Sequence, residues 1–425
     1  MLRLSAASGP LDAVVTVPGS KSIANRALVC AALADGDSRL RGVPGGDDTV
    51  AMAQCLQGLG IGVSLAGDDA VVEGTGGLID AADVVLDANL AGTTSRFVTA
   101  VAALAAGPVT IDGAPPLRRR PMGPLQEALG ALGATVEPAE GEGGLPVTVR
   151  GPLRTGGTVA IRGDVSSQYL TALMLIAPLL DGGLRLHLTT PLVSVPYVRL
   201  TATVMASFGV HDVEIGDDEI FVPPGRYAGR DQDIEPDASS ASYPLAMAAV
   251  VGGRVEVTGL HRTSAQGDAR FADLLARMGC SIDDHGTGLA VRRDPAQTLT
   301  GIDDVDMADV SDLVPTLAAV AVTASTPTTV TGVGFIRAKE SDRLGDLATE
   351  LRTVGADVTV TADGLHIEPA GPLHGGDVAT HHDHRLAMAF GVLGAAVDGI
   401  AVADPDVVSK SWPGYWTVRE AVVHP

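Results

Sequence analysis

The 425-residue chain carries a formal net charge of −22, and 46% of its residues are hydrophobic although only 3% are aromatic. This length and composition suit two or three domains with aliphatic cores. The acidic balance argues against nucleic acid and anionic membranes as partners, because both bind basic surfaces. It leaves small anionic substrates open, because a few cations in a cleft can reverse the local potential.

Sequence features that would direct the chain to a membrane or to secretion are weak. The longest apolar run, 169–180, is too short to cross a bilayer, and residues 1–18 lack the charged start and long apolar segment of a secretory signal. The three cysteines are odd in number and lack metal-binding spacing, which disfavours a disulfide framework. We therefore expect a cytoplasmic protein.

An apolar, helix-like run followed by a short strand-like run occurs six times along the chain. The pairs are 24–34 with 38–43, 95–106 with 108–112, 169–180 with 184–189, 243–250 with 254–259, 313–323 with 328–333, and 386–397 with 400–403. The breaks inside them lie 70 to 75 residues apart, at Gly36, Gly107, Gly182, Gly252, Ser325 and Gly399. Between breaks, a second helix ends at a glycine and a two-strand pattern follows, at Gly60, Gly133, Gly209, Gly279 and Gly355. The sequence therefore predicts an α/β (α+β) protein of six repeats, which suits two domains of three repeats each.

Lysine is rare in a chain that is rich in arginine. Of the 29 lysines and arginines, only Lys21, Lys339 and Lys410 are lysines. A lysine can shift its pKa and transfer a proton, whereas arginine essentially never gives up its proton. Chance survival under a codon bias explains the numbers equally well, so the neighbours of these lysines decide their interpretation.

Polar clusters stand just before the predicted helices, where backbone N–H groups and the helix dipole favour anions. Before the apolar helices they are 18–22 with Arg26, 91–94 with Arg96, 166–168, 239–240, Asp312 and 383–385; before the alternate helices they are 120–121, 194–197, 339–343 and 410–413. A single Ser, Thr or Asp in such a place is explained by an ordinary N-cap. Cations oppose the dipole there, however, so their repeated presence indicates bound anions.

Two motifs that would indicate other functions are incomplete. Residues 19–22 imitate the end of a nucleotide-binding P-loop, but the earlier glycine of that motif is missing. His381, His382 and His384 suggest a metal site, yet an arginine follows directly and no second cluster matches them. We therefore expect neither nucleotide hydrolysis nor a bound metal, and we interpret these histidines as structural or hydrogen-bonding residues.

Eight motifs, in order along nearly the whole chain, resemble those of the 3-phosphoshikimate 1-carboxyvinyltransferase family of enolpyruvyl transferases. They are Pro18-Gly19-Ser20-Lys21-Ser22 with Asn25-Arg26, Ala91-Gly92-Thr93-Thr94 with Arg96, Arg120-Pro121-Met122, Val165-Ser166-Ser167-Gln168, Asp237-Ala238-Ser239-Ser240-Ala241-Ser242-Tyr243, Lys339-Glu340-Ser341-Asp342-Arg343, Asp383-His384-Arg385 and Lys410-Ser411-Trp412-Pro413. All three lysines fall inside these motifs.

The resemblance implies a two-domain inverse α/β barrel in which each domain contains three βαβαββ units. Residues 1–17 and 235–425 would form one domain and residues 18–234 the other, with the active site in the cleft between them. The family also implies a monomer that needs neither metal nor cofactor.

The implied reaction transfers the enolpyruvyl group of phosphoenolpyruvate to the 5-hydroxyl of shikimate 3-phosphate and releases phosphate. By resemblance, shikimate 3-phosphate would contact Lys21, Ser22, Arg26, Ser166, Ser167, Gln168, Ser194, Asp312 and Lys339. Phosphoenolpyruvate would contact Lys21, Gly92, Arg120, Gln168, Arg343, Arg385 and Lys410. Both substrates carry a phosphate and a carboxylate, which fits the many basic residues at helix starts.

The chemistry requires a base near the hydroxyl and an acid/base group over the methylene carbon. We assign Asp312 to the hydroxyl and Glu340 to the carbon, and Lys21 is the candidate proton donor to the leaving phosphate. Two positions depart from the family pattern, since Leu90 and Phe335 stand where asparagine is usual. The family also implies inhibition by glyphosate, with Gly92 leaving space beside the phosphoenolpyruvate site.

Three alternatives share parts of this pattern. The sister enzyme that uses UDP-N-acetylglucosamine has a similar architecture, but its loop cysteine and its Lys-Asn pair are absent, because Ser22 follows Lys21. A binding-only relative would have lost catalysis, yet the candidate catalytic residues are retained. A cyclase that acts on RNA ends has a related fold, but the acidic charge weighs against it.

Overall fold

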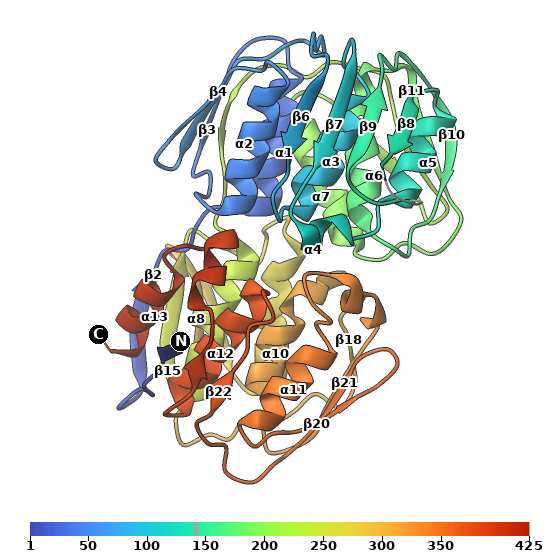
Figure 1. Ribbon diagram of the computed structural model, residues 1–425. Coiled ribbons are helices and arrows are strands. Elements are labelled where there is room, and N and C mark those ends of the chain that lie inside the picture. Colours follow the sequence, from blue (N-terminus) through green and yellow to red (C-terminus); the bar gives the residue numbers. More distant parts are fainter. Residues whose placement is uncertain (140–142, 425) are drawn as a thin grey trace. The chain divides into compact units, whose positions relative to one another are not determined.

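The computed structural model of the protein describes residues 1–139 and 143–424. These residues divide into two compact units. Unit 1 contains Met1–Pro18 and Glu235–Pro425, and unit 2 contains Gly19–Ile234. Figure 1 shows the helices and strands of both units.

One arrangement of strands and helices recurs, and the middle of unit 2 shows it in full. Strand β6 (Val84–Asp87) runs parallel to β7 (Pro108–Asp112), which pairs antiparallel with β9 (Val147–Arg150). Strand β8 (Thr135–Pro138) lies at the edge beside β9. Helix α3 (Gly92–Ala102) joins the parallel pair, and α5 (Gly123–Ala131) leads from β7 to the hairpin. The unit is therefore βαβαββ.

The same four-strand order appears in the two other sheets of unit 2, β10-β11-β13-β12 and β14-β3-β5-β4, as far as its described residues extend. The strands are β3 (Ser38–Arg41), β4 (Val63–Ala66), β5 (Asp69–Val72), β10 (Thr155–Ile161), β11 (Asp181–Leu188), β12 (Glu214–Ile215), β13 (Glu219–Val222) and β14 (Asp231–Asp233). The helices are α1 (Lys21–Ala32), α2 (Asp47–Gly58), α4 (Pro115–Arg118), α6 (Ser167–Ile176), the 3-10 helix η1 (Ala177–Leu179) and α7 (Val195–Ser207).

Unit 1 contains two sheets of this order, β16-β17-β15-β2 and β18-β19-β21-β20, and a sheet β1-β23-β22, counted over its described residues. The strands are β1 (Leu2–Arg3), β2 (Leu11–Val15), β15 (Gly253–Thr258), β16 (Ser281–His285), β17 (Gly288–Arg293), β18 (Val305–Asp306), β19 (Thr328–Thr331), β20 (Asp357–Val360), β21 (Leu365–Glu368), β22 (Asp377–Val378) and β23 (Ala401–Val402). The α-helices are α8 (Ala238–Val251), α9 (Phe271–Arg277), α10 (Val314–Ala321), α11 (Gly345–Thr353), α12 (His384–Ala396) and α13 (Tyr415–Val423). The 3-10 helices are η2 (Gly267–Arg270), η3 (Ala308–Leu313), η4 (Gly334–Ala338) and η5 (Pro405–Lys410).

Two parallel strand pairs join segments that lie far apart in the sequence. Strand β2 pairs in parallel with β15, with Ala13 opposite Val255, although more than 230 residues separate them. Strand β14 pairs in parallel with β3, with Gln232 opposite Leu40. The chain thus starts in unit 1, builds unit 2 from α1 to β14, and returns to unit 1 at α8.

The sixth repeat differs from the βαβαββ units that the resemblance implies. Its parallel pair, β22 and β23, is followed by α13, where the described chain ends without a further hairpin. The N-terminal strand β1 pairs antiparallel with β23 instead, with Leu2 opposite Val402. The first residues of the chain therefore take the place of the missing hairpin strand.

The first helix of each repeat is almost completely buried, whereas sheets lie outside it. In unit 1, α8, α10 and α12 pack against one another, and their buried residues are mostly alanine, valine, leucine and methionine (Figure 1). Small side chains allow helix axes to approach closely, which explains how a core with so few aromatic residues is filled. Such helices carry no polar face, so their starts are the places where polar side chains gather.

The glycines that were predicted to end the second helices are confirmed as helix ends. Gly355 follows α11 with φ of 93°, a left-handed conformation that other residues adopt at a cost, and its N–H donates to the Arg352 carbonyl at 3.0 Å. The glycines at the corresponding places also have positive φ; they are Gly60, Gly133, Gly209 and Gly279. Within the described chain, no helix has both the length and the apolar character required to span a membrane.

A buried arginine ties the N-terminal segment of unit 1 to the helix core. Arg419 of α13 is fully buried, and its guanidinium donates to the carbonyls of Ser5, Gly391 and Gly394 at 2.8 to 3.1 Å. Arg419→Met would leave these carbonyls without their donor, so we expect unfolding free energy to fall by about 3 kcal/mol in urea titrations. The control Glu420→Gln removes the half-exposed partner of Arg419 and should change stability by less than about 1 kcal/mol. Equal effects of the two changes would contradict this account.

Candidate active site

In unit 2, the first helix begins at the candidate proton donor. Ser20 caps α1, its hydroxyl accepting from the Ile23 N–H at 3.4 Å, and Lys21 is the first helical residue. The Lys21 Nζ lies 3.0 Å from Oδ2 of Asp48, a buried residue in the first turn of α2. Sequence analysis did not single out Asp48, because an acid in a first helical turn is explained by the dipole alone.

Arg26 lies one turn further along α1 and is buried. Its Nε donates to the Thr201 hydroxyl at 2.8 Å, and its Nη1 donates to the Ser22 carbonyl at 2.7 Å. Nη2 donates to the Thr171 hydroxyl and the Tyr197 carbonyl, each at 3.3 Å. Burial lowers the pKa of Arg26 to about 10. This guanidinium therefore joins α1 to α6 and α7, and it anchors Ser22 through its carbonyl.

The start of α3 brings two arginines against one glycine. Arg96 is buried, and it donates to the Gly92 carbonyl at 2.7 Å and to the Pro121 carbonyl at 3.2 Å. Its guanidinium carbon lies over the ring of Tyr169, 5.6 Å from the ring centroid. A Cβ added to Gly92 would lie 2.5 Å from Nη1 of Arg120 and 2.6 Å from Nη1 of Arg96. Only a glycine admits both guanidiniums so near the backbone of a helix start.

The starts of α6 and α7 supply hydroxyls and an amide. Ser166 caps α6, its hydroxyl accepting from the Gln168 N–H at 3.3 Å, and Ser167 follows it into the first turn. The Gln168 side chain donates to the Thr93 hydroxyl of α3 at 3.0 Å. Ser194 precedes α7 in a left-handed conformation, with φ of 58°. Unit 2 thus presents hydroxyl groups at helix starts, where backbone N–H groups favour a phosphate.

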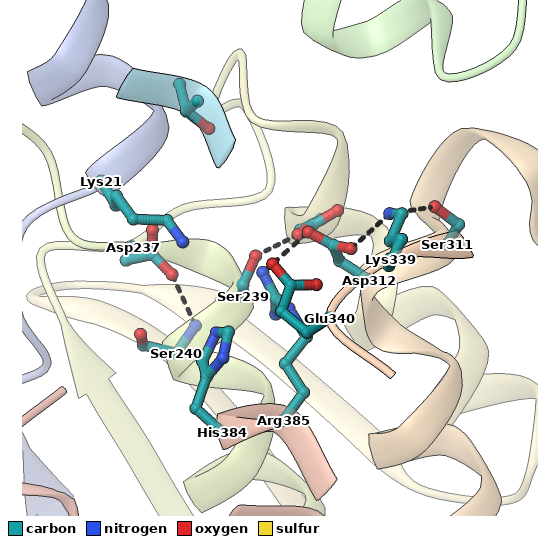
Figure 2. A network of polar contacts seen from close by, with 12 residues as sticks. Lys21, Asp237, Ser239, Ser240, Ser311, Asp312, Lys339, Glu340, His384 and Arg385 are labelled. Carbon is teal, nitrogen blue, oxygen red and sulfur yellow. Dashed lines mark hydrogen bonds and ion pairs between the residues drawn. The ribbon is translucent and has the colours of Figure 1, made fainter. Parts of the chain in front are cut away.

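In unit 1, Asp312 lies at the centre of a cationic cluster. Its Oδ1 accepts from Nζ of Lys339 at 2.6 Å and from Nη1 of Arg343 at 2.9 Å. Its Oδ2 accepts from Nη2 of Arg385 at 2.7 Å. Figure 2 shows Lys339 and Arg385 pointing toward this carboxylate, and Ser311, which accepts from Lys339 at 3.1 Å, beside Lys339.

Arg343 extends the cluster to two further carboxylates. Its side chain is 1% exposed, its Nη2 donates to Oε2 of Glu340 at 2.6 Å, and its Nε donates to Oδ2 of Asp383 at 2.8 Å. Asp383 also caps α12 by accepting from the Arg385 N–H at 2.9 Å. One buried guanidinium therefore positions the proposed carbon acid, the proposed base and the start of α12.

The charges of this cluster control the basicity of Asp312. Burial alone would raise the pKa of its carboxyl group, but Arg385, Lys339 and Arg343 hold that pKa well below its usual range. Burial lowers the pKa of Lys339, against the opposing effect of Asp312. Burial would also lower the pKa of Arg343, but Asp383, Glu340 and Asp312 raise it overall. In the protein without substrates, Asp312 is accordingly a weak base.

Two further positions of unit 1, Lys410 and Phe335, have distinct surroundings. Lys410 ends the 3-10 helix η5 and is 6% exposed. Phe335, which replaces the usual asparagine, places its ring 5.7 Å from Nζ of Lys339 in a cation–π contact. This position therefore offers a π face where family members commonly offer an amide.

The three histidines of segment 381–384 have different surroundings. His381 Nε2 lies 2.8 Å from Oε1 of Glu350, His382 is exposed, and His384 is buried at the start of α12. Throughout 1–139 and 143–424, no group of three or more His, Cys, Asp or Glu is arranged to hold a metal ion.

The structure thus brings together Asp312, Glu340, Lys339, Arg343 and Arg385 in unit 1. In unit 2, Arg120 lies beside Gly92, and Arg26 is bonded to Ser22. Sequence reasoning missed Asp48 and Asp268, which interact with candidate residues, because each follows a glycine-containing segment and resembles an ordinary turn or helix-start acid.

Comparisons with known proteins decide the family. A family model described as EPSP synthase (3-phosphoshikimate 1-carboxyvinyltransferase) matches residues 6–418. The chain belongs to the EPSP synthase family. A 3-phosphoshikimate 1-carboxyvinyltransferase of Methanoculleus marisnigri is 45% identical over 411 residues, which is 96% of each chain. One from Nostoc punctiforme is 43% identical over 419 residues, 98% of this chain and 97% of the relative.

The EPSP synthase fold is also found by structural comparison. An EPSP synthase structure from Acinetobacter baumannii superimposes with a TM-score of 0.82 at 24% identity, over 99% of this chain and 98% of the other. The two-domain inverse α/β fold expected from the sequence is therefore confirmed, with the sixth repeat completed by β1 as described above.

Proposed function

We propose that this protein transfers the enolpyruvyl group of phosphoenolpyruvate to the 5-hydroxyl of shikimate 3-phosphate and releases phosphate. The family and the full-length relatives support this reaction. The observation that carries it in the structure is the Asp312 cluster, where cations and carboxylates meet in one place. Such a cluster can bind an anion and move protons, which the reaction requires.

The proposed roles divide between the two sets of residues. The helix starts of unit 2 would bind shikimate 3-phosphate, with the hydroxyls of Ser166, Ser167 and Ser194 on its phosphate. Arg120 and Lys21 would bind the phosphate of phosphoenolpyruvate beside Gly92. Arg343, Arg385 and Lys410 would bind the phosphoenolpyruvate, and Lys339 would hold the acceptor ring with Asp312.

In the proposed mechanism, Asp312 takes the proton of the 5-hydroxyl while the hydroxyl oxygen bonds to C2 of phosphoenolpyruvate. Glu340 delivers a proton to C3, and a tetrahedral intermediate forms. The C2–O bond to phosphate then breaks, with Lys21 giving the leaving phosphate a proton, and Glu340 removes a proton from C3 to restore the double bond. The cationic side chains offset the negative charge throughout.

The direct test is phosphate release from phosphoenolpyruvate in the presence of EDTA. Shikimate 3-phosphate and UDP-N-acetylglucosamine are offered in separate reactions, and we expect release with shikimate 3-phosphate alone. Release with the nucleotide sugar alone would keep the chemistry but replace the acceptor. Release with neither, although both substrates bind, would indicate a binding-only relative.

The close approach of Arg120 to Gly92 leads to a prediction about the phosphoenolpyruvate site. Gly92→Ala places a methyl group 2.5 Å from the guanidinium, so Arg120 must shift. We expect the KM for phosphoenolpyruvate to rise about tenfold, as overpacking of 1 to 3 kcal/mol implies, and inhibition by glyphosate to weaken. The control Gly130→Ala on α5 meets no atom within 4 Å and should leave both unchanged. If glyphosate inhibited Gly92→Ala as strongly as the wild type, the proposal that it binds beside Gly92 would be wrong.

A further inference from the structure

Asp268 is a buried carboxylate that the proposed mechanism does not use. It lies in η2, which packs against α8 and against η3, the segment that carries Asp312. Its side chain accepts a hydrogen bond from the Ser239 hydroxyl in the first turn of α8. A buried carboxylate is costly to a folded protein, so a carboxylate buried at this place points to a role in function.

Asp268 and Asp312 interact with the same guanidinium. Arg385 donates to Oδ2 of Asp312 at 2.7 Å and also attracts the charge of Asp268. Burial raises the pKa of Asp268 to about 6, and the charge of Asp312 adds to this effect. The Ser239 hydrogen bond and Arg385 oppose it, while Asp237 contributes a further repulsion. The negative charge of each carboxylate therefore disfavours the negative charge of the other.

We propose that Asp268 is a positioning residue: it fixes the Ser239 hydroxyl and shares the charge of Arg385 with Asp312, so that Asp312 can still accept a proton. This inference rests on the proposed function, in which Asp312 is the base. Three cations contact Asp312 and weaken it as a base. A second negative charge nearby offsets part of that effect.

The groups that face Asp268 come from three elements. Ser239 belongs to α8 and Asp237 caps the same helix, Asp312 belongs to η3, and Arg385 belongs to α12. Replacing Asp268 by asparagine keeps an oxygen that can accept from Ser239 but removes the charge. Asp268→Asn therefore separates the electrostatic role from the hydrogen bond.

The charge of Asp268 should affect the thermal stability of the protein independently of catalysis. Its folded pKa of about 6 lies above the usual unfolded value of about 4, so the folded protein binds the proton more tightly between these pH values. Wild-type stability therefore decreases as pH rises through this window. Asp268→Asn lacks this decrease, so its Tm should exceed that of the wild type at pH 8 and match it near pH 4.

The decisive experiment measures phosphate release against pH for the wild type, Asp268→Asn and the control Glu256→Gln. Glu256 is a buried carboxylate on β15 that pairs with Arg254 and Thr287, so its replacement should leave activity unchanged. In Asp268→Asn we expect kcat to fall about ten- to hundredfold with little change in KM, as a weakened base implies. The acid limb of the kcat profile should move to lower pH, because Asp312 loses its negative neighbour.

Each outcome decides between the inference and the function on which it rests. A wild type that releases no phosphate overturns the proposed function and this inference with it. An active wild type whose Asp268→Asn variant keeps the same kcat and profile overturns the inference alone. A fall in kcat that is equal at every pH indicates a merely structural role and also overturns it.

Discussion

Asp312→Asn should bind anions more tightly than the wild type while losing nearly all turnover. In the free protein the Asp312 carboxylate contacts Lys339, Arg343 and Arg385. Under the proposed function, the two arginines must receive a substrate anion. The carboxylate therefore competes with substrate for the same cations, and its removal should release them.

The expected sizes follow from the lost charge and the lost base. Removal of a general base costs about a hundred- to ten-thousandfold in kcat. Loss of one competing ion pair of about 1.4 kcal/mol would strengthen binding of inorganic phosphate or phosphoenolpyruvate about tenfold. Calorimetric titration measures binding with each anion separately, and phosphate release measures kcat.

Glu350→Gln provides the matched control, since it also removes one negative charge from unit 1. Glu350 lies on α11, and its carboxylate bonds to His381 and to the Ala379 N–H. Its replacement should change neither anion affinity nor kcat by more than about threefold, because these bonds are made to groups other than the three cations that contact Asp312. Equal tightening in both variants would show that net charge alone acts, and weaker binding in Asp312→Asn would contradict the competition.

The same geometry implies that substrate binding strengthens the base. The cations that hold the pKa of Asp312 well below its usual range would turn to the substrate anions. The pKa of Asp312 should then rise on binding, and the complex should take up protons at acidic pH. The base thus gains strength only when its reaction partners are present.

The sequence predicted the repeats because their signals are local. Apolar runs mark the buried first helices, and a glycine such as Gly355 marks a helix end that requires a left-handed conformation. The pairing of β2 with β15 and of β14 with β3 joins segments far apart in the sequence, which no local pattern reveals. The replacement of a hairpin strand by β1 was missed for the same reason.

The residues of the candidate site also divide into those that local sequence motifs reveal and those that only tertiary contacts reveal. Lys21, Arg343 and Arg385 stand in recognisable motifs at helix starts, so sequence could single them out. Asp48 and Asp268 act only through tertiary contacts, with Lys21 and with Ser239 respectively. Each looks like an ordinary acid near a turn, because local sequence cannot show which carboxylate a cation will meet.

Glu340→Gln should lose hydrogen exchange at C3 as well as turnover, whereas Asp312→Asn should keep the exchange. Arg343 positions the Glu340 carboxylate through a 2.6 Å bond, and an amide cannot deliver and recover a proton in its place. We expect kcat to fall about a hundred- to ten-thousandfold, as for other proton-transfer groups.

The roles of Glu340 and Asp312 can be distinguished by starting the reaction from its product in D2O. The product, 5-enolpyruvylshikimate 3-phosphate, is incubated with phosphate, and deuterium in its methylene group is measured by mass spectrometry. In this exchange, C3 is protonated and phosphate adds to C2, and both steps are then reversed. These steps require the acid/base group over the carbon, but they do not require the base for the 5-hydroxyl. Exchange should therefore survive in Asp312→Asn and disappear in Glu340→Gln.

Glu340→Asp shows whether the carboxylate or merely the Arg343 contact matters. The shorter side chain keeps the charge but moves it by about one methylene, so exchange should persist at a reduced rate, because misplacement of about 1 Å costs up to about a hundredfold. If Glu340→Gln instead incorporates deuterium at the wild-type rate, Glu340 is not the carbon acid. The proton would then have to come from another group, and Glu340 would be a positioning residue rather than a catalytic one.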